Sequence, residues 1–222
     1  LHAPSIDSYL GTNKVALLPY RLASATARCF QGSKIYGKGF LLTPDEARAH
    51  TQSHPFESSV IRPYLDGRDL NAHPRHLPTR FVVDFREWTE EQCRRFPAAF
   101  AIVEQRVRPE RLRSTYSDLK DYWWRFQRRR REMYDAITGL QLVIVTARVS
   151  STNGVAFVPT NMVLNEKLVV FPFDDHFSFS VLQCGLHWEW AWQFGSTLKQ
   201  DLNYSTTDVF ETLVWPSHSD TA

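Results

Sequence analysis

Cysteine is scarce in this chain of 222 residues. Cys29, Cys93 and Cys184 are odd in number and widely spaced, and no Cys-x-x-Cys pair occurs. The sequence therefore supports neither a zinc ribbon nor a disulfide framework. A reducing compartment fits this cysteine usage, and we expect a cytoplasmic protein.

Long apolar runs and net charge are also missing. No run of about 18 apolar residues occurs, so we expect no membrane contact. A charged stretch followed by an apolar one, the pattern of a signal peptide, is also missing, so a signal peptide is unsupported. The net charge of +2 excludes a polybasic tail-like binder, so a polyanion would have to meet local clusters of basic residues. The chain starts at Leu1 without Met, and we expect a fragment of a longer polypeptide.

Recognisable catalytic patterns are absent as well. The sequence contains no His-Glu-x-x-His, no Gly-x-Ser-x-Gly and no Walker loop. Asp174-Asp175-His176 could ligate a metal, but adjacent side chains point in different directions, and helix capping explains these residues better. We therefore predict no catalytic and no metal-binding residues.

The chain does contain a strong β pattern between residues 141 and 173. Residues 142–149 are apolar and β-branched, Asn153-Gly154 indicates a tight turn, residues 155–158 predict the return strand, and residues 167–171 predict a third strand. We expect these strands to form a meander with polar loops at its edges. Those edges carry side chains of the types that reach base edges and phosphates: Arg148, Ser150, Ser151, Thr152, Asn153, Asn161, Asn165 and Lys167. An ordinary buried meander with solvated turns is the alternative.

Basic residues cluster between residues 106 and 131, where ten Lys or Arg oppose three acidic residues and aromatic residues are interleaved. Such a mixture suits a nucleic-acid backbone. The alternative is a solvated amphipathic helix whose aromatics face the core, and for Trp123 and Phe126 we expect core packing. Candidate phosphate contacts are Lys34 and Lys38, beside glycines that permit close backbone approach, together with Arg128, Arg129, Arg130 and Lys199.

Several local signals predict where elements begin and end. Thr43 and Glu46 predict a capping box around a helix with Pro44 in its first turn. Asp66-Gly67 predicts a tight turn, and Asp175 can cap one helix running from residue 176 to Gly195. Residues 196–204 read as a polar loop and residues 210–216 as a last strand. The fold class we expect is α+β, a mixed, largely antiparallel sheet with helices packed around it.

Taken together, eight segments resemble the target recognition domain of MmeI-like restriction–modification enzymes and related adenine-specific DNA methylases. The segments are Cys29-Phe30-Gln31-Gly32-Ser33-Lys34, the stretch 39–47, Pro63-Tyr64-Leu65-Asp66-Gly67-Arg68-Asp69-Leu70-Asn71, Trp123-Trp124, Ala147-Arg148-Val149-Ser150, Lys167-Leu168-Val169-Val170-Phe171, the stretch 194–204 and Asp208-Val209-Phe210-Glu211-Thr212. No single motif is decisive, but their order and spacing cover nearly the whole chain.

This resemblance implies a DNA-reading domain of a larger S-adenosylmethionine-dependent adenine-N6 methyltransferase, which can also carry a nuclease. The methylase signature Asn-Pro-Pro-Tyr/Phe is absent, so S-adenosylmethionine, and Mg²⁺ for a nuclease, would bind elsewhere in the parent polypeptide and not in this fragment. The partners implied are double-stranded DNA and the methyltransferase domain. The family reads bases around the segment that matches residues 148–167.

We divide the chain into an arm at residues 1–14, a DNA target recognition domain at 15–216 and a tail at 217–222. Two other functions stay open. One is a protein–protein docking module that uses Trp188, Trp190 and Trp192, and the other is a stand-alone metal-dependent hydrolase that uses Asp175 and His187.

Overall fold

The computed structural model describes residues 19–216. The arm expected at residues 1–14 and the tail at 217–222 lie outside these residues. The first described element is a 3₁₀ turn, η1 (Ala23–Ala25). Across the described residues, no helix is long and apolar enough to cross a membrane.

The central sheet consists of β1 (Phe30–Gln31), β5 (Leu142–Ala147), β7 (Val155–Pro159) and β9 (Leu168–Phe171), in the order β1-β9-β5-β7. All of its pairings are antiparallel, and β5 pairs with both β7 and β9. The predicted strands are confirmed, but the meander order is wrong. Between β7 and β9 the chain passes through β8 (Val163–Leu164), which joins another sheet, and it therefore returns on the far side of β5.

Both faces of the central sheet are buried, because successive side chains of a strand point to opposite faces. Val143, Val145 and Ala147 of β5 face one core, which α2 (Gly67–Ala72) and α7 (Arg131–Ala136) cover. Ile144 faces the other core, formed with α8 (His176–Gln183), α9 (Gly185–Phe194) and the π-helical turn η3 (Thr206–Phe210). A strand buried on both faces explains the continuous apolar run seen in the sequence.

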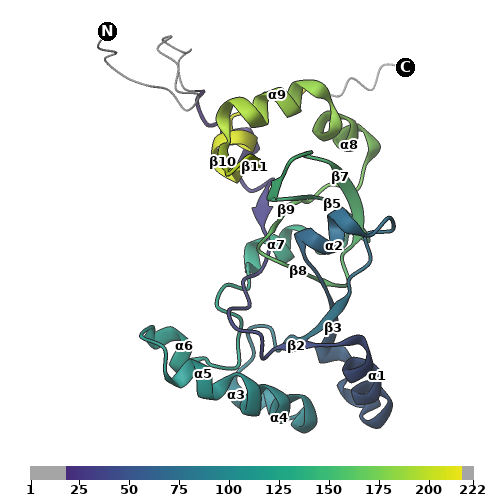
Figure 1. Ribbon diagram of the computed structural model, residues 1–222, viewed down its shortest axis with the longest axis vertical. Coiled ribbons are helices and arrows are strands. Elements are labelled where there is room, and N and C mark those ends of the chain that lie inside the picture. The colour runs from purple at the N-terminus through teal and green to yellow at the C-terminus, as the bar shows by residue number, and fades with distance from the viewer. Residues whose placement is uncertain (1–18, 217–222) are drawn as a thin grey trace.

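A second sheet lies toward the other end of the molecule, with the order β2-β4-β3-β8 (Figure 1). It contains β2 (Leu41–Leu42), β3 (Ile61–Leu65) and β4 (Arg80–Val83), and its β3–β8 pair is parallel. Around it lie the 3₁₀ helix η2 (Pro55–Val60) and the helices α1 (Pro44–Ser53), α3 (Glu90–Cys93), α4 (Pro97–Arg106), α5 (Arg108–Leu112) and α6 (Ser117–Asp121). Trp123 and Phe126 are buried in this core, as predicted.

Capping follows the sequence closely in two helices. Thr43 and Glu46 form the predicted capping box of α1, and Asp175 caps α8 by accepting from the backbone N–H of Ser178 at 2.7 Å. The start of α4 has no local side-chain cap. Instead the buried carboxylate of Glu57 accepts from the N–H groups of Ala98 and Ala99, a long-range contact that local sequence rules do not reveal.

The upper end of the molecule departs from the predictions (Figure 1). The single helix expected after Asp175 is broken at Cys184, which is extended and exposed. The expected polar loop at 196–204 is a hairpin of β10 (Ser196–Leu198) and β11 (Asp201–Asn203), which pairs with β6 (Val149–Ser150). Instead of the expected last strand, the chain forms η3 and a turn.

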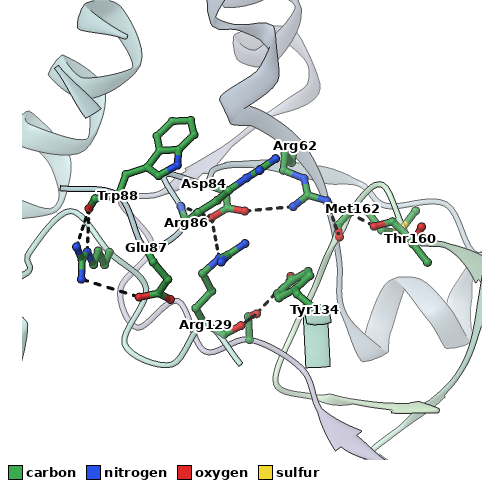
Figure 2. A network of polar contacts seen from close by, with 11 residues as sticks. Arg62, Asp84, Arg86, Glu87, Trp88, Arg129, Tyr134, Thr160 and Met162 are labelled. Carbon is green, nitrogen blue, oxygen red and sulfur yellow. Dashed lines mark hydrogen bonds and ion pairs between the residues drawn. The ribbon is translucent and has the colours of Figure 1, made fainter. Parts of the chain in front are cut away.

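A buried charge network joins the two halves of the fold (Figure 2). Asp84, 2% exposed, lies 3.2 Å from Nη1 of Arg62 and 3.8 Å from Nε of Arg129. Arg62 also donates to the backbone carbonyl of Met162, just before β8. The network therefore holds the β7–β8 connection and the segment before α7 against the end of β4.

Candidate nucleic-acid interface

Arg148 occupies the junction between the central sheet and the β10–β11 hairpin. Its backbone N–H donates to the carbonyl of Lys167 at 2.7 Å, and its own carbonyl accepts from the N–H of Tyr204 at 2.8 Å. These two bonds join the backbone of Arg148 to segments that lead into different sheets. They fix the position from which its side chain projects. Within residues 19–216 its guanidinium forms no hydrogen bond and no ion pair, so it is free to bind a ligand.

Two surface hollows meet at Arg148. One of about 550 Å³ lies between the start of α2, the β8–β9 turn and the hairpin, and its lining residues are Gly67, Arg68, Asn71, Arg148, Val149, Glu166, Lys167 and Leu198. The other, of about 270 Å³, includes Gln31, Arg148, Asn203, Ser205 and Thr206 in its lining. Three cations against one carboxylate give the first hollow a positive charge, and the second presents amide and hydroxyl groups together with the carboxylate of Asp208.

The cationic surface continues to Arg130, which lies near enough to Arg148 for the charge of Arg148 to affect its pKa. Burial is the largest cause of the lowered pKa of Arg130, and Arg128 and Arg148 lower it further. The guanidinium of Arg130 donates to Oε1 of Gln31 at 2.8 Å, and Gln31 donates to the carbonyl of Glu166 at the same distance. Gln31 therefore holds Arg130 beside the turn that carries Lys167.

Three of the predicted base-reading residues are buried. Asn165 donates its amide to the Tyr64 hydroxyl and accepts from the N–H of Lys167 at 2.7 Å, so its hydrogen-bonding groups are used inside the fold. Ser150 and Asn153 are 9% and 4% exposed. The expected tight turn at Asn153-Gly154 is wrong, because the connection from β5 to β7 is longer than two residues and contains β6, and only Asn153 of the two has a positive φ, 26°.

The other predicted residues fall in three places. Lys167 joins Arg148, whereas the exposed Ser151 and Thr152 line a separate hollow near Cys184. Asn161 is exposed at the far end of β7. The structure therefore brings together only some of the predicted base-reading residues.

The candidate phosphate contacts also separate. Arg128 and Lys38 are exposed, and Lys34 is half-buried and paired with Arg128 through their backbones. Lys199 is exposed at the hairpin turn, with a φ of 61°, next to Leu198 of the larger hollow. Arg129 points inward, 14% exposed, and lies over the Tyr134 ring, so it serves the buried network instead.

Sequence reasoning missed Arg68, Asn71 and Gln31 at this surface. The Asp66-Gly67 pair starts α2 rather than a tight turn, because Asp66 accepts from the N–H groups of Arg68 and Asp69. Burial raises the pKa of Asp66, but these bonds and Arg80 outweigh it and leave the pKa lowered. A Cβ on Gly67 would lie 3.2 Å from the Lys167 carbonyl oxygen, so glycine lets α2 approach β9. Asp66, a favoured N-cap residue, followed by the acidic Asp69 in the first turn was the available signal for a capped helix.

The residues weighed for hydrolysis do not form a site. Asp175 caps α8 at the surface, whereas His187 is 1% exposed and bonded to the Leu182 carbonyl and the Tyr204 hydroxyl. In the part of the chain that the structure describes, no group of three or more His, Cys, Asp or Glu residues is arranged to hold a metal ion.

The sequence as a whole matches a known family. A family model described as the MmeI target recognition domain matches residues 20–217. This chain belongs to that family. The resemblance drawn from the eight sequence segments is thereby confirmed, and no curated protein matches the chain.

A solved structure extends this finding to the fold of the target recognition domain. The chain is similar to the Type IIL restriction-modification enzyme MmeI, solved in complex with DNA, with a TM-score of 0.76 and 18% sequence identity. The match covers 98% of this chain and 29% of the MmeI chain, so the domain spans less than a third of that protein's length. The expected α+β class, with mostly antiparallel sheets and packed helices, is confirmed.

Proposed function

We propose that this domain reads the sequence of double-stranded DNA for a larger restriction–modification polypeptide. The observation that carries the proposal is the guanidinium of Arg148, which has no partner within residues 19–216 and lies at the meeting point of two hollows, on a backbone bonded on both sides. Membership of the MmeI target recognition domain family supports this function, and so does the DNA bound to the structurally similar MmeI.

Arg148 is the residue we assign to a base edge. A guanidinium donates two parallel hydrogen bonds to O6 and N7 of guanine, and such a pair discriminates against other bases by about 1–3 kcal/mol. A rigid backbone matters here, because a flexible arginine would pay conformational entropy for every contact. Asn71, beside it in the larger hollow, has the side-chain amide that suits adenine.

Phosphate contacts are assigned to the exposed cations around Arg148. Arg68, Lys167 and Lys199 surround the larger hollow, and Arg128 extends the surface beyond Arg130. Ser151, Thr152 and Asn161 remain candidates for DNA contact at a distance from this centre. Asn165, Ser150 and Arg129 leave the proposed DNA-contacting set, because the fold uses or buries their side chains.

The domain would hold DNA while a methyltransferase domain of the same polypeptide flips and methylates an adenine. Flipping costs stacking and pairing energy, so the flanking duplex must be gripped firmly. S-adenosylmethionine, and Mg²⁺ for any nuclease, would bind outside this chain, which lacks the Asn-Pro-Pro-Tyr/Phe signature. A cytoplasmic location fits this role.

Selection from a random duplex library tests the proposal. The purified 222-residue chain should enrich a defined sequence. Arg148→Ala should accept other bases at one position of that sequence, which we expect to be a guanine. Arg95→Ala is a matched control, because Arg95 is an exposed arginine near α3, at the opposite end of the molecule from the hairpin (Figure 1). Selection of the same sequence by Arg148→Ala would remove Arg148 from the reading site, and no enrichment by the wild type would refute the function.

Docking to other parts of the polypeptide is a second candidate, and one observation favours it. A mostly apolar hollow of about 320 Å³ lies between α8, α9 and residues 213–216, where the side chains of Leu186 and Val214 are 71% and 73% exposed. Trp190 and Trp192, two of the tryptophans expected to form a docking surface, are partly buried against the core formed with α8, α9 and η3. Leu186→Asp should weaken co-purification of this chain with a separately expressed methyltransferase domain while leaving DNA selection unchanged.

A further inference from the structure

A third hollow, of about 420 Å³, lies between the loop after β6 and the break between α8 and α9. Its lining residues are Ser151, Thr152, Asn153, Leu182, Gln183, Cys184, Gly185 and Trp188, none of which is charged. Only Val149 and Ser150 separate this loop from Arg148, so the hollow adjoins the proposed DNA surface. Gln183 accepts from the N–H of Val155 at 3.0 Å and ties the loop to α8.

Asn153 is the most unusual member of the lining. Its side chain is buried, yet its Oδ1 atom has no hydrogen-bond partner among the described residues. Buried amides are almost always hydrogen-bonded, because leaving one unpaired forfeits the bond it would make with water. An unpaired amide beside an open hollow indicates a ligand with complementary polar atoms.

The start of α9 forms the opposite wall. Cys184 precedes this ten-residue helix in an extended conformation and gives it no side-chain cap. The first N–H groups of a helix have no acceptor within the helix and can donate to a ligand. A Cβ added to Gly185 would meet nothing within 4 Å, so the space beside the first residue of α9 is open.

Trp188 supplies an aromatic surface one turn further along α9. It is half-buried, and its ring meets Trp192 edge to face with centroids 5.7 Å apart. Aromatic side chains bind the flat faces of nucleobases regardless of sequence. The hollow therefore combines an aromatic surface, an amide oxygen without a partner among residues 19–216, and the N–H groups at the start of α9.

We propose that this hollow binds one unpaired nucleobase of the DNA that lies across Arg148. A nucleobase is planar, uncharged and carries both donors and acceptors, which matches the lining group by group. A phosphate would bring its charge into a site with no cation, although a helix N-terminus alone would favour it. This inference rests on the proposed function, since the DNA must first lie on the neighbouring surface.

Three labelled duplexes of one sequence test the inference by fluorescence anisotropy with the full 222-residue chain. The first is fully paired, the second has a one-nucleotide adenine bulge, and the third has the same bulge without its base. We expect the adenine bulge to bind roughly tenfold more tightly than the abasic bulge, because stacking on an aromatic side chain is lost in the latter. Trp188→Ala and Asn153→Gly should bring this ratio to about one, and Trp188→Phe should keep most of it.

Controls separate the hollow from the rest of the surface. Tyr116→Ala removes an exposed aromatic residue between α5 and α6 and should preserve the ratio. Arg148→Ala should weaken all three duplexes alike. Asn153→Gly should leave the thermal unfolding midpoint nearly unchanged, since glycine adopts the positive φ of this residue and the Asn153 Oδ1 atom has no hydrogen-bond partner among the described residues; a large loss would show a structural role and overturn the assignment of Asn153.

The remaining outcomes are also decisive. A ratio of one in the wild type, with Arg148-dependent binding of the paired duplex, would overturn the nucleobase site and leave the proposed function standing. If inorganic phosphate abolishes the preference for the adenine bulge and adenosine does not, the hollow binds an anion and the nucleobase site is overturned. If no duplex binds, the proposed function fails, and equilibrium dialysis with adenosine decides the hollow: binding lost in Trp188→Ala supports it, and no binding refutes it.

Discussion

The backbone N–H of Arg148 donates to the carbonyl oxygen of Lys167 at 2.7 Å, so two cations on neighbouring segments line one hollow. This bond continues the antiparallel pairing of β5 with β9 by one residue beyond Ala147 and Leu168. The geometry separates two tasks. Arg148 projects from a junction fixed on both sides, whereas Lys167 and Arg68 are exposed at the rim, where they can meet phosphates.

Removing a rim cation should change the salt dependence of DNA binding without changing the selected sequence. Each phosphate contact contributes about 0.9 to the slope of log affinity against log salt. Lys167→Ala and Arg68→Ala should each lower the slope by about that amount, measured by anisotropy from about 50 to about 200 mM salt. Arg95→Ala serves as the distant control, and an unchanged slope in Lys167→Ala would remove that residue from the interface.

Asn165→Ala should reduce stability and leave sequence preference intact. The change removes the partner of the buried Tyr64 hydroxyl and the acceptor for the Lys167 N–H. An unsatisfied buried group costs about 1–3 kcal/mol, which urea unfolding followed by circular dichroism can measure. Asn161→Ala, at an exposed position, should stay within about 0.5 kcal/mol of the wild type. Altered sequence selection by Asn165→Ala at full stability would restore this residue to the reading set.

Asp84→Asn should destabilise the domain strongly. Asp84 faces Arg62 and Arg129 in the buried network of Figure 2, and the neutral amide would leave both guanidinium groups without their carboxylate. Removing one partner of a buried ion pair costs about 3–5 kcal/mol. Asp45→Asn, at an exposed ion pair, is the control and should change the unfolding free energy by less than about 1 kcal/mol. A small effect of Asp84→Asn in urea unfolding would contradict the structural role of the network.

Acid should lower the free energy of unfolding through His187, which lies on α9 beside the core formed with α8, α9 and η3. Burial is the main cause of the lowered pKa of this histidine, so the folded state favours the neutral ring. The unfolded chain binds a proton more readily, and stability therefore rises with pH through this window. The contribution of the neutral His187 ring to stability should be complete above about pH 6.5, the ordinary pKa of histidine. This contribution should be lost as the pH falls toward the lowered pKa.

Urea unfolding between about pH 7.5 and pH 5 checks this dependence, a range that brackets the ordinary histidine pKa. His187→Gln should unfold more easily at neutral pH and show a weaker loss on acidification. His54→Gln, at an exposed residue, should follow the wild type at every pH. A wild-type profile that His187→Gln reproduces in full would assign the acid sensitivity to other groups.

Local chemistry in the sequence determined several features outright. Thr43, Pro44 and Glu46 are sufficient for the start of α1, because a capping box needs only residues within one turn. The β-branched runs at 142–147 and 168–171 form strands whose two buried faces match their apolar composition. The eight segments and their spacing also determined the family, which the family model confirms.

Tertiary structure decided which polar side chains of the loops reach solvent. Asn165 and Arg148 look equally suited to DNA in the sequence, yet the first is bonded to Tyr64 of β3, while the second lies at an open junction beside the hairpin at 196–203, with no side-chain partner in the described part of the chain. Both outcomes depend on partners far away in the chain, and local residue patterns carry no information about such partners. The order of β9, β5 and β7 and the inward turn of Arg129 toward Asp84 have the same cause, since each follows from long-range pairing that only the folded chain provides.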